Sequence, residues 1–365
     1  MTQTLNTRQH VRKIGCTLGA LVFGLTGMAS ASALTDTEFQ INTTISGSQQ
    51  QPTLARNASG ETLVAWKHDG TNRGSRALMA QRYDSAGALV GRESILYQAN
   101  KIDIDRPAVA IDRHGMGLAV WEGQSSDGAG RDIFSQRFDS SNRPMGSVAR
   151  VNATTAGHQR HAAVAMGPDG QSIILWETTP DRRDDTDIFG QRYDANGAPV
   201  GNEFRLNTAR AGNQTNPVAV IDHQGGLFAV WQGESPKGRG LALYGQRYDV
   251  EGNHLGPEFL LNTEQTPARM PAAMATNDDG HIAVMWPTDD PEIAPLRLVA
   301  QYYDLAGTPT VVPELTEFPW QISYGQMVRQ LVWDSETPVL TVWTRFDKAT
   351  QWDIKGQWIF GNDYP

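Results

Sequence analysis

The sequence predicts an all-β protein built from repeated four-stranded units. The segment 187–208, DIFGQRYDANGAPVGNEFRLNT, defines the unit, and related strings recur along almost the whole chain. A Gln-Arg-aromatic-Asp element and an upstream Trp each recur about every 55 residues, which divides the chain from Glu38 to its end into six units. Four-stranded units of this length, repeated roughly four to eight times, are typical of the blades of a β-propeller. We therefore expect a six-bladed β-propeller.

The first 33 residues have the pattern of a secretory signal peptide. Arg8, Arg12 and Lys13 precede an apolar run over 14–28, and small residues follow over 29–33. The run is too short for a membrane span, so we expect the protein to be exported to the periplasm or beyond, with no membrane segment in the mature chain. The single cysteine, Cys16, would leave with the signal peptide. Disulfides and thiolate chemistry are then excluded, and we predict no cofactor and no metal site.

The charge of the chain limits its partners. The formal net charge is −9, and removal of the basic N-terminus makes the mature protein more acidic still. Nucleic acids and anionic membrane surfaces both favour Lys and Arg clusters, so neither is expected as a partner. A glycan or a surface protein is compatible with this charge, and the oligomeric state is left open.

Each unit reads as four short strands joined by repeated turns. In the second unit we expect strands over 107–112, 118–121, 132–139 and 148–152. An Asx-x-x-Gly string follows the first and the third strand of most units, as at Asp112 to Gly115, and is suited to a tight β connection. The first two strands are apolar on both faces, which is typical of strands buried between two layers. The blades are expected over about 52–97, 107–152, 162–207, 217–262, 271–315 and 329–360.

Two features predict how the blades assemble. The recurrent Trp is most simply the large packing residue between neighbouring blades, at Trp66, Trp121, Trp176, Trp231, Trp286 and Trp343. Segment 38–43 matches the fourth-strand segment 203–208, although no blade precedes it. The last unit ends without a fourth strand of its own. We therefore expect segment 38–43 to complete the sixth blade and remove the exposed edges.

The repeat resembles a family of tandem units found in exported and surface proteins of bacteria. Its pattern is "P-x-V-A-x-D-x-x-G-x-x-x-V-x-W … I-x-x-Q-R-Y-D-x-x-G-x-x-x-G-x-E-F-x-V-N-T", and it covers essentially all of 38–360. The sixth unit departs most, with Trp358 where Arg is usual. The resemblance implies propeller blades and leaves the activity open.

The divergent connections are where we expect a site. Strands alternate in direction, so the repeated tight turns share one face and the variable connections share the other. Residues just before each inner strand should surround the channel on the variable face: Gln51, Arg106, His161, Asn216, Met270 and either Met327 or Val328. Arg106 and His161 depart most, and His158 and Arg160 precede His161 in the string AGHQRH. Such a set could hold a carboxylate or supply a base with an electrostatic partner, or it could fill the channel mouth.

Three further features offer weaker sites. Asp187 ends the charged loop 181–187, and Asp132 and Asp353 occupy matching positions; close carboxylates could bind a cation, although such a loop is usually solvated surface. The third-strand arginines recur near a Trp and near Glu93, Glu203 or Glu258. That set suits sugar binding or plain interblade packing. Trp320 belongs to an aromatic-rich final unit that could form a stacking platform.

The function expected from sequence is a lectin-like exported binding module for a glycan or another extracytoplasmic partner. The alternative is a hydrolase or lyase acting on polysaccharide, with its site at the channel mouth, and a third possibility is a structural or assembly role. Neither a GxSxG string nor a His pair at i, i+4 is present, so serine-hydrolase and zinc-protease chemistry has no local support.

Overall fold

The computed structural model contains strands and turns, and no helix, in the residues that it describes. These residues are 38–71, 76–99, 103–124, 128, 130–180, 185–208, 212–222, 224–236, 241–262, 271–276, 282–290, 293–304, 308–309, 315–316, 339–347 and 351–359. The predicted signal peptide lies outside them. All the strands belong to one compact unit, Ala33–Pro365. In the described part of the chain no helix is long and apolar enough to cross a membrane.

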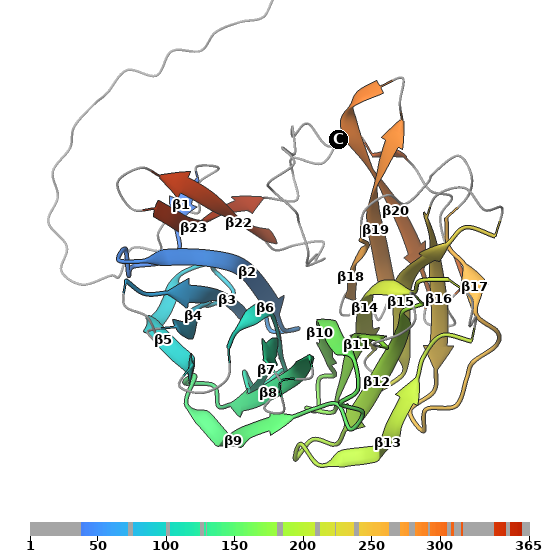
Figure 1. Ribbon diagram of the computed structural model, residues 1–365. Helices are drawn as coiled ribbons and strands as arrows, with labels where there is room; N and C mark the ends of the chain where they lie inside the picture. The colour runs from blue at the N-terminus through green and yellow to red at the C-terminus, as the bar shows by residue number, and fades with distance from the viewer. Residues whose placement is uncertain are drawn as a thin grey trace, which may run out of the picture. The chain divides into compact units, whose positions relative to one another are not determined.

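Five antiparallel sheets each contain four strands that follow one another in the chain (Figure 1). The first contains β2 (Ser48–Arg56), β3 (Thr62–Asp69), β4 (Arg76–Tyr83) and β5 (Leu89–Ala99), and the second β6 (Asp105–Ile111), β7 (Gly117–Gln124), β8 (Arg131–Phe138) and β9 (Pro144–Arg150). The third contains β10 (His158–Met166), β11 (Ser172–Thr179), β12 (Asp187–Tyr193) and β13 (Pro199–Arg205), and the fourth β14 (Thr215–Ile221), β15 (Leu227–Glu234), β16 (Leu241–Tyr248) and β17 (Phe259–Leu260). The fifth contains β18 (Ala273–Thr276), β19 (Ile282–Asp290), β20 (Ile293–Tyr303) and β21 (Leu315–Thr316). The predicted four-stranded blade is therefore confirmed in five copies.

The sixth sheet joins the two ends of the repeat array. It contains β1 (Phe39–Gln40), β22 (Val339–Asp347) and β23 (Gln351–Ile359), in the order β1-β23-β22. Phe39 pairs with Gly356, and Gln40 pairs with Lys355. Residues 39–40 of segment 38–43 therefore form the edge strand of this sheet, beside β23.

A buried side-chain clamp fixes this segment. Asn42 Nδ2 donates to Asp353 Oδ1 at 3.0 Å, and the amide of Ile354 donates to Asn42 Oδ1 at 2.7 Å. Within the second sheet Asn152 makes the same two contacts with Asp132 and Ile133. The equivalence shows that the N-terminal segment uses the chemistry of an ordinary fourth strand.

The recurrent tryptophans pack between sheets, as predicted. Trp66, Trp121, Trp176, Trp231 and Trp286 are each 0% exposed. Trp121 of β7, for example, packs against Leu63 and Leu78 of the preceding sheet. Replacing such a residue by Ala in a core typically costs about 3–5 kcal/mol, so these seams are a large part of the stability. The side chain of Trp343 lies outside the described residues.

The repeated Asp residues form turns, also as predicted. Asp112 Oδ1 accepts from the amides of His114 and Met116 at 2.8 and 2.9 Å, and Gly115 has a φ of +73°. The carboxylate thus bonds its own turn, and Gly supplies the left-handed backbone that the turn needs.

The N-terminal clamp can be tested against its internal equivalent. We expect Asn42→Ala to lower the free energy of unfolding by about 2–4 kcal/mol, because it leaves a buried carboxylate and a buried amide without their partner. Asn152→Ala should cost a similar amount for the same reason. Urea unfolding of both variants measures this. If Asn152→Ala destabilises the protein and Asn42→Ala does not, segment 38–43 does not act as a fourth strand.

Candidate functional site

Four polar residues adopt left-handed backbone at equivalent points of the first four sheets. Gln51, Arg106, His161 and Asn216 have φ values of +54°, +45°, +49° and +52°. We call these residues the left-handed row. Each lies at a register shift between the inner strand and the second strand of its sheet. Left-handed backbone costs about 1–2 kcal/mol in residues other than Gly, so something in each sheet must hold it.

A side chain of the preceding sheet accepts the backbone N–H of each later residue in the row. The amide of Arg106 donates to Gln51 Oε1 at 2.7 Å. The amide of His161 donates to Glu122 Oε1 at 2.7 Å, and that of Asn216 donates to Glu177 Oε1 at 2.6 Å. At each register shift the chain forms a β-bulge, which would leave this amide without an acceptor. The contact from the preceding sheet supplies one.

The side chains of Arg106, His161 and Asn216 contact partners within their own sheets, whereas Gln51 Nε2 donates to Asp105 of the next sheet at 2.7 Å. Arg106 NH1 lies 3.3 Å from Glu122 Oε1, and Asn216 Nδ2 donates to Gln232 Oε1 at 2.9 Å. His161 Nδ1 lies 2.7 Å from Glu177 Oε2, a charge contact that is not aligned as a hydrogen bond. A continuous line of polar contacts therefore runs from Gln51 to Gln232. The structure brings Arg106 and His161 together, because both contact Glu122 Oε1.

Glu122 and Glu177 are functional candidates that the sequence reasoning missed. Glu122 is 0% exposed and Glu177 is 4% exposed, although both are ionisable. A signal was present: each directly follows the repeat Trp, at a position that otherwise varies. Buried carboxylates are costly unless paired, and here several donors surround them.

Asp105 adds a third carboxylate beside the row. Its Oδ1 accepts from Gln51 Nε2 at 2.7 Å, and its Oδ2 lies 3.3 Å from Arg131 NH1. Burial alone would raise the pKa of Asp105, but the Gln51 hydrogen bond and the charges of Arg131, Lys67 and Arg106 outweigh it. The pKa is therefore lowered from its ordinary value of 3.8. Ionised Asp105 therefore contributes its full stabilisation above the unfolded pKa of 3.8. This contribution is lost as the pH falls through the lower pKa of the folded state.

The remaining predicted residues fall elsewhere or cannot be placed. His158 and Arg160 lie in β10 just before the bulge, where His158 Nδ1 and Arg160 Nε are buried without a hydrogen bond to any described residue. Trp320, Met270, Met327 and Val328 lie outside the described residues.

The carboxylate of Asp187 works inside its own sheet, unlike the prediction of a ligand site. Its Oδ1 accepts from Asn207 Nδ2 at 2.7 Å, which is the clamp that Asn42 makes with Asp353. The fourth-strand Asn explains why an Asp recurs before the Ile. We therefore assign Asp187 a structural role.

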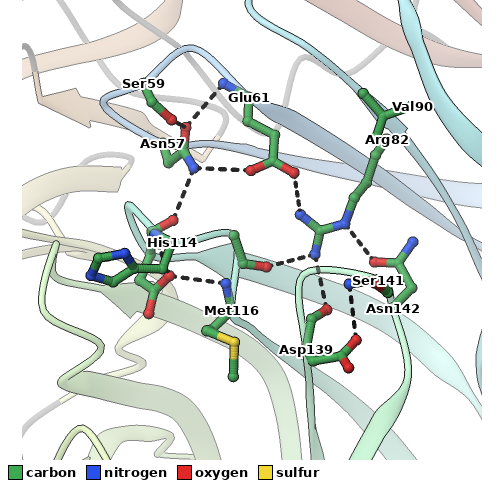
Figure 2. A network of polar contacts seen from close by, with 12 residues as sticks. Asn57, Ser59, Glu61, Arg82, Val90, His114, Met116, Asp139, Ser141 and Asn142 are labelled. Carbon is green, nitrogen blue, oxygen red and sulfur yellow. Dashed lines mark hydrogen bonds and ion pairs between the residues drawn. The ribbon is translucent and has the colours of Figure 1, made fainter.

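The third-strand arginines serve the tight-turn end of the sheets, and Arg82 shows how (Figure 2). This side chain is 2% exposed. Its guanidinium donates to Glu61 Oε1, Asn142 Oδ1 and the Gly115 carbonyl oxygen, each at 2.7 Å. Arg137 likewise donates to the carbonyl oxygen of Ala195 in the next sheet at 2.7 Å. These arginines connect neighbouring sheets.

The predicted Arg, Glu and Trp sugar set is wrong in its geometry. Glu93 Oε2 accepts from the amide of Thr43 at 2.6 Å, and Glu203 and Glu258 accept from amides at the corresponding places. The seam tryptophans that are described are fully buried and offer no face to a sugar. Interblade packing, the simpler interpretation, accounts for the set.

Comparisons with known proteins support the fold. No protein-family model matches the sequence, and no curated protein matches it. The structure is similar to the α-L-arabinanase of Penicillium chrysogenum complexed with arabinobiose, with a TM-score of 0.57, 12% identity and coverage of 90% of this chain and 100% of that one. It is also similar to the α-L-arabinofuranosidase of Fusarium graminearum, with a TM-score of 0.57, 9% identity and coverage of 87% and 94%. A protein of unknown function from Dyadobacter fermentans is similar with a TM-score of 0.55, 13% identity and coverage of 87% of this chain and 96% of that one.

Together with the five four-stranded sheets, these similarities establish a β-propeller of antiparallel blades. In the described part of the chain no group of His, Cys, Asp and Glu is arranged to hold a metal ion.

The left-handed row predicts a stability effect at Glu122. We expect Glu122→Ala to lower the free energy of unfolding by about 2–4 kcal/mol, because the amide of His161 loses its acceptor and Arg106 its partner. Glu122→Gln should cost less, since an amide oxygen can still accept from His161. Glu251→Ala, at an exposed turn, serves as the control. Equal urea midpoints for wild type and Glu122→Ala would show that packing alone holds the bulge.

Proposed function

We propose that this protein is an exported enzyme that cleaves a polysaccharide, with its site at the left-handed row. One observation carries the proposal: His161 is held between two buried glutamates, its amide on Glu122 and its imidazole beside Glu177. Strained backbone that the surroundings hold in place is a frequent feature of active sites. Four such residues in register, all polar, mark this end of the sheets.

The chemistry of this pair suits proton transfer. A neutral imidazole can accept a proton, and the carboxylate of Glu177, 2.7 Å from Nδ1, is placed to compensate the positive charge that then forms. His161 is 30% exposed, so its ring is accessible, whereas Glu177 is buried behind it. Cleavage of a glycosidic bond requires proton transfer to or from a positioned group, and Arg106 beside it supplies positive charge for developing negative charge.

The similar structures support an enzyme over a module that only binds. Two of them are named as an α-L-arabinanase and an α-L-arabinofuranosidase, each in complex with arabinobiose. The repeated seam sites that a multivalent lectin would use are buried. Glycan binding without cleavage remains the second candidate function, because the same exposed groups of the row could hold a sugar.

The complete architecture and the export route are also proposals. We propose six blades closed by segment 38–43, supported by the pairing of β1 with β23 and by the packing of Trp66 and Leu54 against Ile354 of the last sheet. We propose that residues 1–33 are a signal peptide, supported by their basic, apolar and small-residue segments.

The proposal predicts that His161 is needed for turnover and not for folding. We expect His161→Ala to lower the release of new reducing ends from a panel of plant and bacterial polysaccharides by at least about 100-fold, since general acid-base groups contribute on that order. Circular dichroism should show an unchanged fold.

The matched control is His114→Ala, which removes an exposed histidine from a tight turn. It should retain wild-type activity. If His161→Ala releases reducing ends as fast as the wild-type protein does, the site lies elsewhere. If wild type binds a polymer of the panel and cleaves none, the protein is a binding module.

A further inference from the structure

We propose that the glycan recognised at the left-handed row carries carboxylates, as in a polymer of uronic acids. This inference rests on the proposed function and specifies its substrate class. It comes from the way in which the charges around Arg106 and His161 are sorted by depth.

At this site the basic groups are partly exposed and the two glutamates are buried, whereas the side chain of Asp105, which pairs with Arg131, is 22% exposed. The side chain of Arg106 is 38% exposed and that of Arg131 is 27% exposed. Their shared partner Glu122 is 0% exposed, and Glu177 is 6% exposed. A ligand approaching the row therefore meets guanidinium and imidazole groups first. The two glutamates compensate those charges from behind, where a ligand does not reach them.

Arg106 keeps part of its guanidinium available. It contacts Glu122 through NH1, at 3.3 and 3.4 Å from the two carboxylate oxygens. These contacts are long for a charge-assisted hydrogen bond, which is usually about 2.7–2.9 Å. No described residue accepts a hydrogen bond from its Nε or NH2. A planar pair of free donors matches a carboxylate, which arginine binds in a bidentate way.

The position of Arg106 relative to His161 fits the proposed chemistry. Both residues contact Glu122 Oε1, one through its side chain and the other through its amide. A sugar carboxylate held by Arg106 therefore lies on the sheet that precedes His161, whose backbone amide shares the Glu122 oxygen with Arg106. Neutralising that carboxylate lowers the cost of removing the proton from the neighbouring carbon. The C–H electron pair then forms a carbon–carbon double bond, the glycosidic C–O bond breaks, and the leaving oxygen takes a proton from water.

The charge of the whole chain opposes the binding of a polyanion, whereas the exposed basic groups of the row favour it. The formal net charge of −9 repels a polyanion at long range. Recognition of a uronate must then come from the local basic groups. We expect such binding to depend on Arg106 and to weaken with added salt.

The test compares polymers that differ only in the carboxylate. Polygalacturonate, alginate and hyaluronan are each offered beside their carboxyl-reduced counterparts, and reducing ends and bound polymer are both measured. We expect wild type to prefer a carboxylate polymer over its reduced form by ~10- to 100-fold, the value of one charged hydrogen-bonding partner. Arg106→Met should lose this preference, and Arg106→Lys should restore part of it.

Arg113→Met is the matched control, since Arg113 is an exposed arginine on a tight turn that pairs with Asp169. It should keep the preference. If neutral and reduced polymers are cleaved as well as the uronates, or if Arg106→Met keeps the preference, the inference is overturned while the proposed cleavage stands. If nothing is cleaved but carboxylate polymers bind through Arg106, cleavage fails and the ligand class is supported.

Discussion

The acceptor for each left-handed amide is the constraint on which the site depends. A residue with positive φ turns its backbone N–H away from the ladder of its own sheet, and a buried N–H needs a partner. In this protein the partner comes from the preceding sheet, as Glu122 does for His161 and Glu177 for Asn216. The same bond therefore joins neighbouring sheets and fixes the orientation of the side chains that a ligand would meet.

The two ends of the sheets use polar groups in different ways. At the tight-turn end, Arg82 is buried and directs its donors to Glu61, Asn142 and the Gly115 carbonyl oxygen. At the other end, strained backbone is retained and the side chains of Arg106 and His161 remain partly exposed. The tight-turn end serves cohesion between sheets, and the left-handed row keeps groups that can act on another molecule.

The repeat predicted the blades, the turns, the buried tryptophans and the place of segment 38–43, because each depends on a pattern that recurs in the sequence. The left-handed backbone was not predictable in this way. Gln51, Arg106 and Asn216 each precede Pro, which favours extended backbone, and only the three-dimensional bulge overrides that preference. Glu122 and Glu177 were missed because they stand inside otherwise apolar strands. The hydrogen bond between Asn207 and Asp187 was not predicted, because the two residues lie 20 positions apart in the sequence.

The pairing rule of the row explains why its chemistry can differ from blade to blade. Each side chain meets the residue 16 positions later, as Arg106 meets Glu122 and Asn216 meets Gln232. The left-handed amide of the next sheet needs only an oxygen acceptor on that later residue, as Glu122 provides for His161. The two side chains of one sheet can therefore change as a pair without loss of the bulge. In the first sheet this position is Lys67, which has no acceptor, and the amide oxygen of Gln51 replaces it. Among the first four sheets, acidic residues at this position occur in the second and third, so the charges of the row gather around Arg106 and His161.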